Sequence, residues 1–196
     1  MGMRNRGWLA LRKKILIYCE GETERIYFEQ MRILKRSEMV SVKVKNVRRS
    51  AIKLAQHAYR DASHQPFDEV WIVFDQDDLS DKQLAEVNDF CAERNIRIAY
   101  TNEAFELWLL LHFEQIDVSR VYPRALLNEK MEEYLGITRY IKNKANAEII
   151  APIALRHEIA IRNCAEMMKA RNEDSRDNPY CNVHDMIRTI FQTQFC

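Results

Sequence analysis

The sequence predicts an α/β fold with a mostly parallel sheet of four strands flanked by helices, followed by a helical C-terminal part. Up to about residue 115, short apolar runs that suit buried strands alternate with segments of helical periodicity, which is typical of βαβ units. Beyond that point the strand pattern disappears. We therefore expect an α/β unit over residues 12–115 and a helical part over 116–196 packed on it.

The four expected strands differ in how they are buried. Residues 15–19 and 70–74 are continuous apolar runs, as in strands that are covered on both faces. Residues 40–44 alternate valine with polar residues, which indicates one face in contact with water. Residues 96–100 form the fourth strand. The alternation of strands and helices predicts a largely parallel sheet.

Helices are expected wherever apolar residues recur at helical spacing next to a start or stop signal. Thr23 and Ser50 are candidate N-caps, Pro123 suits a first helical turn and Gly136 suits a helix end. The segment 103–113 is apolar on nearly all sides, so this helix should be deeply buried. The expected helices begin near Thr23, Ser50 and Ser80, span 103–113, 123–136 and 152–169, and end with a short one after Asn182.

Composition indicates a globular cytoplasmic protein. Hydrophobic residues make up 47% of the chain and charged residues 30%, which argues against a disordered class. The five cysteines contain no C-x-x-C pair, which favours free thiols in a reducing compartment. No apolar run approaches the roughly 18 residues that span a bilayer, so no membrane partner is expected. The net charge of +1 neither indicates nor excludes a nucleic-acid partner.

Acidic residues follow two of the predicted strands at the point where each strand ends. Glu20 comes directly after the first strand and Asp75 directly after the third, so both should lie at the edge where parallel sheets bind ligands. Asp77 lies two residues on, and Glu24 one helical turn beyond Glu20. Carboxylates gathered in this way repel one another unless a divalent cation is present. We expect Mg²⁺, or Mn²⁺ in its place, serving phosphodiester chemistry.

A structural interpretation of the same residues stays open. Asp75, Asp77 and Asp78 are also good turn-formers, and one of them could cap the following helix. Either acidic motif alone would be weak, and their matching positions at two strand ends favour the functional interpretation.

Basic side chains supply candidates for phosphate binding. Lys144, beside Lys142 in a basic segment, is a candidate for the cation that stabilises phosphate charge in the transition state. Arg48 and Arg49 follow the second strand and could contact a phosphate backbone. For all four, a solvated surface is the alternative. A structural and a nucleic-acid-binding role are equally consistent with His184.

Four segments resemble motifs of one known family. Residues 18–24 (YCEGETE) resemble the E-G-x-x-E motif of Toprim domains, and residues 73–77 (VFDQD) resemble their D-x-D motif. Residues 101–113 (TNEAFELWLLLHF) and 178–184 (NPYCNVH) are similar to more specific segments of RloB-like proteins. The resemblance extends from about residue 12 to 190, and it departs from the family pattern at Thr101 and Glu103.

This resemblance implies a Toprim-like fold and nuclease chemistry like that of the OLD-family Toprim nucleases. It also implies a role in abortive phage resistance beside an AAA-type ATPase. By the same resemblance, Glu20 is a metal ligand or general base, Asp75 and Asp77 are the other main ligands, and Glu24 is the second glutamate of its motif. Glu106 would complete the acidic site.

Three functions are therefore weighed. A metal-dependent endonuclease acting on DNA or RNA in anti-phage defence is the leading hypothesis. A regulatory or sensing module, which binds an ATPase or nucleic acid without cleaving it, is the alternative. Nucleotidyl transfer of the primase type ranks last. The oligomeric state stays open, a homo-oligomer included.

Overall fold

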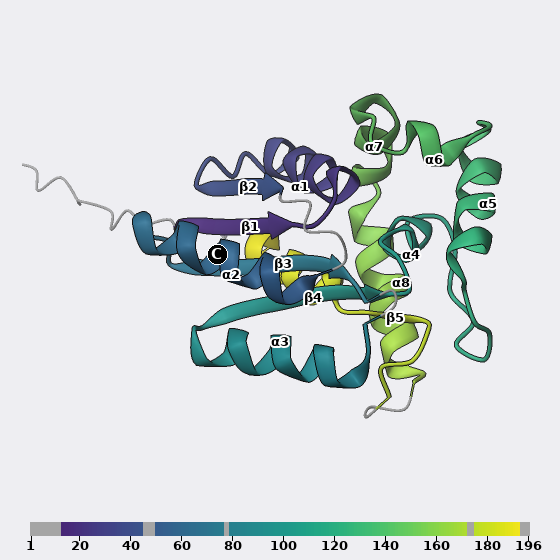
Figure 1. Cartoon of the computed structure of the whole chain (residues 1–196). Coiled ribbons are helices and arrows are strands. Elements are labelled where there is room, and N and C mark those ends of the chain that lie inside the picture. The colour runs from purple at the N-terminus through teal and green to yellow at the C-terminus, as the bar shows by residue number, and fades with distance from the viewer. Residues whose placement is uncertain (1–12, 45–49, 77–78, 172–174, 193–196) are drawn as a thin grey trace, which may run out of the picture.

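The computed structural model of the chain describes residues 13–44, 50–76, 79–171 and 175–192 (Figure 1). None of the helices in these ranges is long and apolar enough to cross a membrane. The elements, in chain order, are β1 (Ile15–Cys19), α1 (Glu22–Leu34), β2 (Val40–Val44), α2 (Ala51–His64), β3 (Glu69–Asp75), α3 (Asp81–Glu93), β4 (Ile96–Asn102), α4 (Glu106–Leu110), α5 (Arg124–Leu135), α6 (Tyr140–Asn143), α7 (Ala147–Ala154), α8 (His157–Lys169), β5 (Tyr180–Cys181), α9 (Val183–Ile187) and the π-helical turn Arg188–Gln192.

The sheet has five strands in the order β2-β1-β3-β4-β5. The four strands expected from the sequence are present and parallel to one another. The expectation of only four strands was wrong, because β5 pairs antiparallel with the end of β4. This strand has two residues, which is too short to display the alternating pattern by which strands are predicted.

Each face of the sheet is covered by its own hydrophobic cluster. Ile15, Ile17 and Cys19 of β1 face a cluster that includes α1, α4, α8 and α9, while Leu16 and Tyr18 face α2 and α3. Figure 1 shows α1 above the sheet and α3 below it. Burial on both faces explains why β1 and β3 are continuous apolar runs rather than alternating ones.

Several helix boundaries differ from those predicted. Helix α1 begins at Glu22 with Gly21 as its N-cap, so Thr23 is inside the helix and does not cap it. The predicted helix 103–113 is regular only from Glu106 to Leu110. The predicted helix 152–169 is two helices, α7 and α8. Helix α7 starts earlier because the Asn146 side chain caps it by accepting the Glu148 N–H, and it ends two residues after Pro152.

Other start and stop signals were interpreted correctly. Ser80 caps α3 in a capping box with Gln83, in which each side chain bonds the other's backbone N–H. Helix α5 follows Pro123 and ends at Gly136, whose φ of 62° is left-handed and suits glycine. Figure 1 shows α5, α6 and α7 beyond the strand ends, at the carboxyl edge of the sheet.

Candidate active site

The carboxyl ends of β1 and β3 lie side by side. These neighbouring parallel strands pair Cys19 with Val73, and the Glu20 N–H donates to the Val73 carbonyl at 3.0 Å. Asp75 is the last residue of β3. Glu20 directly follows Cys19 and Asp75 lies two residues beyond Val73, so both lie at the ends of adjacent strands, at the edge where the sequence predicts an acidic site.

Glu24 reaches this edge from the first turn of α1, and its side chain is buried. Its carboxylate folds back over Gly21: a Cβ added to Gly21 would lie 2.5 Å from Oε2 of Glu24. A side chain at position 21 would therefore displace the carboxylate. This contact gives a physical reason for a glycine three residues before the second glutamate of the E-G-x-x-E motif.

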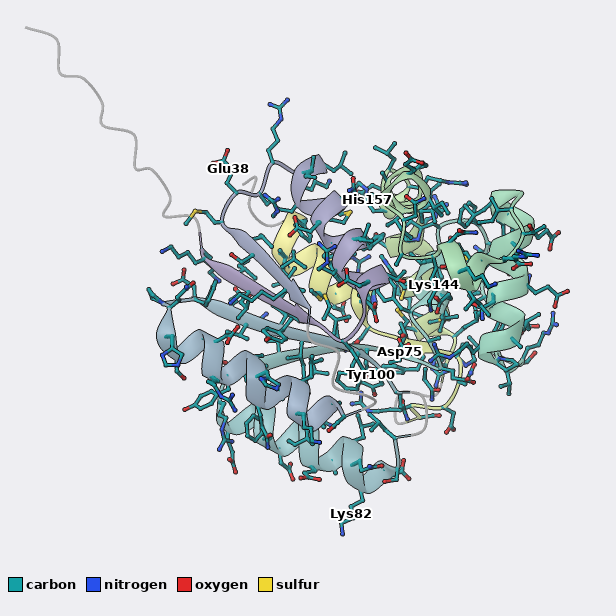
Figure 2. All side chains as sticks on the ribbon, turned by 45° about the horizontal axis from the view of Figure 1, so that its top comes forward. Glu38, Asp75, Lys82, Tyr100, Lys144 and His157 are labelled. Carbon is teal, nitrogen blue, oxygen red and sulfur yellow. The ribbon has the colours of Figure 1, made fainter. Side chains whose placement is uncertain are left out.

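Glu106 is the most deeply buried carboxylate of the group, with 1% of the residue exposed. Its Oε1 accepts a hydrogen bond from Nζ of Lys144 at 2.8 Å, across the junction between α4 and the end of α6. Its Oε2 has no partner within hydrogen-bond distance among the described residues, although the Tyr140 hydroxyl, which is also buried and unpaired, interacts with this carboxylate. Figure 2 shows Lys144 and Asp75 at the junction between the sheet and the helical part.

Asp75 has two partners from other elements. Oδ2 pairs with Nη2 of Arg124 at 3.2 Å, and Oδ1 accepts from the Thr101 hydroxyl at 3.2 Å. Sequence reasoning missed Arg124, although the segment from Pro123 was correctly predicted to begin a helix. A single arginine in the first turn of a helix carries no recognisable pattern. Thr101, where the family pattern has serine, keeps a hydroxyl next to Asp75.

Burial and mutual repulsion change the acidity of this cluster. Burial and the charges of Asp75 and Glu106 raise the pKa of Glu24 to about 8, against the opposing effect of a backbone hydrogen bond and of Lys144. Burial and the charge of Glu106 raise the pKa of Asp75 to about 7, against the opposing effect of Arg124 and Lys144. Glu24, Asp75 and Glu106 therefore lie close enough to interact strongly, and two cations only partly offset their repulsion.

Of the remaining predicted site residues, only Lys142 and His184 are described, and they lie away from this group. Asp77, Arg48 and Arg49 lie outside the described residues. Lys142 is exposed on α6. His184 is buried in the core, where its Nδ1 lies 3.2 Å from Sγ of Cys164, and this environment favours a structural role.

Two asparagines of the motif at residues 178–184 connect distant parts of the chain. The Asn178 side chain bonds both the N–H and the carbonyl of Tyr122. The Asn182 side chain accepts from the Tyr100 N–H at 2.7 Å and donates to the Ile98 carbonyl at 3.1 Å. We had expected Asn182 to cap α9, and it is the N-cap residue, but its side chain attaches the C-terminal segment to β4 instead.

The residues present fit a hard divalent cation chemically. Carboxylate oxygens from three elements converge, and the buried Oε2 of Glu106 lacks a partner in the described part of the chain. Lys144 and Arg124 neutralise two of the carboxylates. Among the described residues, no group of three acidic, histidine or cysteine side chains is arranged to hold a metal ion directly. A cation would therefore replace these ion pairs rather than add to them.

Comparison with known proteins identifies the family. A family model described as RloB-like protein matches residues 15–190, which covers all the elements discussed above except the last two residues of the π-helical turn. Neither the comparison with curated proteins nor that with solved structures gave a match. Because the family model spans most of the sequence, the chain belongs to the RloB-like protein family.

Proposed function

We propose that this protein is a metal-dependent nuclease with a Toprim-like fold, which hydrolyses phosphodiester bonds of DNA or RNA. The observation that carries the proposal is the convergence of Glu24, Asp75 and Glu106 at the carboxyl edge of the sheet, with a buried oxygen of Glu106 that lacks a partner among the described residues. Buried carboxylates in this number are unfavourable for folding alone, so a bound cation is the simplest reason for them.

Five carboxylates would hold the cation: Glu20, Glu24, Asp75, Asp77 and Glu106. Mg²⁺ or Mn²⁺ bound there would neutralise phosphate charge and lower the pKa of the attacking water. Glu20, half-buried at the end of β1, would accept the proton from that water. This role comes from the resemblance between residues 18–24 and the Toprim motif.

Lys144 and Arg124 would bind the phosphate. Both have a partly exposed side chain, 29% and 34%, while their charged ends contact the carboxylates. When a divalent cation takes over the carboxylates, both cationic ends become available to phosphate oxygens, where they stabilise negative charge that develops during the reaction. Arg48, Arg49 and Lys142 would extend this basic surface along the backbone of the nucleic acid.

The test compares plasmid DNA and structured RNA incubated with the full chain in Mg²⁺, Mn²⁺ or EDTA. Asp75→Asn and Glu106→Gln should lower cleavage about 100- to 1000-fold, because electrostatic stabilisation of this kind contributes several kcal/mol. Glu38→Gln is the matched control, since Glu38 is exposed in the loop before β2, far from Asp75 (Figure 2).

A second measurement in this test does not depend on activity. Mg²⁺ should raise the melting temperature of the wild type and the Glu38→Gln variant, with about 2.7 kcal/mol of added stability at 100 times Kd. Asp75→Asn should abolish the shift. Cleavage that survives both Asp75→Asn and Glu106→Gln would refute the proposal.

A regulatory or sensing module is the second candidate. It is favoured by the two ion pairs, since Lys144 and Arg124 already neutralise Glu106 and Asp75 without a metal. In that case, Mg²⁺ would leave the melting temperature unchanged and no nucleic acid would be cut, even with the partner ATPase present.

The wider setting follows the same resemblance. We place the protein in anti-phage defence in the cytoplasm, with an AAA-type ATPase as partner, as a monomer or homo-oligomer. The four described cysteines are free and buried, which suits a reducing compartment. Co-purification of the protein with an ATPase encoded beside it would test this setting.

A further inference from the structure

A surface cavity of about 530 Å³ opens on the opposite face of the sheet from the acidic cluster, at the same carboxyl edge. Gln76, which directly follows Asp75, forms part of its wall, and its N–H continues the pairing with β4 by donating to the Thr101 carbonyl at 2.8 Å. Successive residues of an extended segment point to opposite faces of the sheet. Asp75 therefore faces the acidic cluster, and Gln76 faces the cavity. The polar lining comes from Gln76, Asp81, Asn88, Ser175, Arg176 and Asp177.

The Arg176 guanidinium is oriented before any ligand binds. Its Nη1 donates to the hydroxyls of Tyr100 at 2.8 Å and Tyr180 at 2.9 Å. The rings of these two tyrosines stack with their centroids 4.7 Å apart. The main-chain carbonyl of Arg176 accepts from the Asn102 side chain at 3.0 Å, which attaches this loop to the end of β4. The wall of the cavity is therefore built on the sheet.

Gln76 supplies an independent observation that points to a ligand. Gln76 is only 9% exposed, and its Oε1 is buried without a hydrogen-bond partner in the described part of the chain. Leaving a buried amide oxygen unpaired is unfavourable. An N–H group of a ligand in the cavity could donate to this oxygen after a small rotation of the Gln76 side chain.

The charges of the lining define the chemical class of the ligand. Among the lining residues that the structure describes, the acidic Asp81 and Asp177 outnumber the basic Arg176, which disfavours a phosphate group inside the cavity. A neutral base with both donors and acceptors suits it. Guanine offers O6 and N7 to an arginine, and its N1–H and amino group to carboxylate or amide oxygens. Leu84 and Ala85 of α3 add apolar contact for the ring.

We propose that this cavity binds a guanine base of the strand whose phosphodiester is cut at the acidic cluster. The inference rests on the proposed function, because it takes the neighbouring carboxylates to be the cleavage site. It makes the nuclease selective for guanine on one side of the cut. A free guanine nucleotide presents the same base, so the experiment separates these two sources.

The first arm measures binding of GMP, AMP, CMP and UMP to the full chain in EDTA by calorimetry. GMP should bind about tenfold more tightly than the others, as expected for loss of one paired base contact. Ala85→Trp, which fills the cavity, and Arg176→Met should each weaken GMP binding about tenfold or more. Lys82→Trp is the matched control on α3, because Lys82 points away from the protein (Figure 2). Equal binding of all four nucleotides, or an unchanged GMP affinity in Ala85→Trp, would overturn the inference.

The second arm measures cleavage of single-stranded oligonucleotides with and without one guanine, in Mg²⁺. Faster cutting beside guanine that is lost in Ala85→Trp and retained in Lys82→Trp supports a base of the substrate strand. GMP binding with cutting that is independent of guanine overturns that assignment in favour of a free nucleotide. GMP binding without any cleavage means that the proposed function has failed and the guanine site has not.

Discussion

Two groups of buried polar side chains lie at opposite ends of α4, and they differ in how their hydrogen bonds are satisfied. Glu106 begins the helix with one oxygen bonded to Lys144 and the other without a described partner. His112, just after the helix, uses both ring nitrogens: Nε2 lies 3.0 Å from the Tyr27 hydroxyl and Nδ1 lies 2.9 Å from the Trp108 carbonyl. Buried polar groups are normally satisfied, so His112 has a complete structural explanation and Glu106 does not.

The largest expected effect tests this difference through stability. His112→Ala should lower the free energy of unfolding by about 3 kcal/mol, because it leaves a cavity and an unpaired Tyr27 hydroxyl in the core. Glu106→Gln should change it by less than about 1 kcal/mol, because the wild-type carboxylate is already poorly satisfied. Urea unfolding measures both, with the exposed His64→Ala as a control. If Glu106→Gln lowered the free energy of unfolding as much as His112→Ala, Glu106 would be as well satisfied in the fold as His112, and the proposed difference would be wrong.

The next effect is a dependence on pH that has opposite signs in the two groups. Burial lowers the pKa of His112 from 6.5 to about 3, and the charges of His157 and Arg156 also lower it. Between these values only the unfolded chain takes up the proton. The contribution of His112 to the free energy of unfolding is therefore complete above pH 6.5 and falls by about 1.4 kcal/mol per unit as the pH decreases toward 3.

The raised pKa values of Glu24 and Asp75 act the other way. Their contribution is present at low pH and is lost as the pH rises through about 7 to 8. Unfolding measured from pH 4 to 9 should show that His112→Gln loses, relative to the wild type, the acid slope that His112 contributes, while Glu38→Gln keeps the wild-type profile. An unchanged acid slope in His112→Gln would contradict the buried neutral histidine.

The smallest effect compares two glycines. Gly21→Ala should weaken Mg²⁺ binding several-fold while changing stability by less than about 1 kcal/mol, because the added methyl group displaces only the end of the Glu24 side chain. Gly136→Ala should do the reverse, losing about 1 kcal/mol from its left-handed backbone with no effect on Mg²⁺. Titration calorimetry and thermal melts measure the pair. Equal Mg²⁺ affinity in both variants would remove the role assigned to Gly21.

The sequence predicted the parallel strands and the edge at which Glu20 and Asp75 lie, because apolar runs and strand ends are local patterns. It predicted Glu106 only through a family resemblance, since a glutamate in an apolar helix has no local signal of its partners. Arg124 and the cavity beside Gln76 were missed. Both depend on residues that are distant in sequence and meet only in the folded chain, such as Arg176 and Tyr100.

The position of β5 has a consequence for biosynthesis. This strand covers the end of β4, yet the ribosome makes β4 first, with residues 103–179 still to be translated before Tyr180 emerges. During that interval the free edge of the nascent sheet is open to pairing with other chains. Lys144 and Arg124 also arrive after the carboxylates that they neutralise. A nascent chain should therefore benefit from a chaperone until Tyr180 and Cys181 have been synthesised.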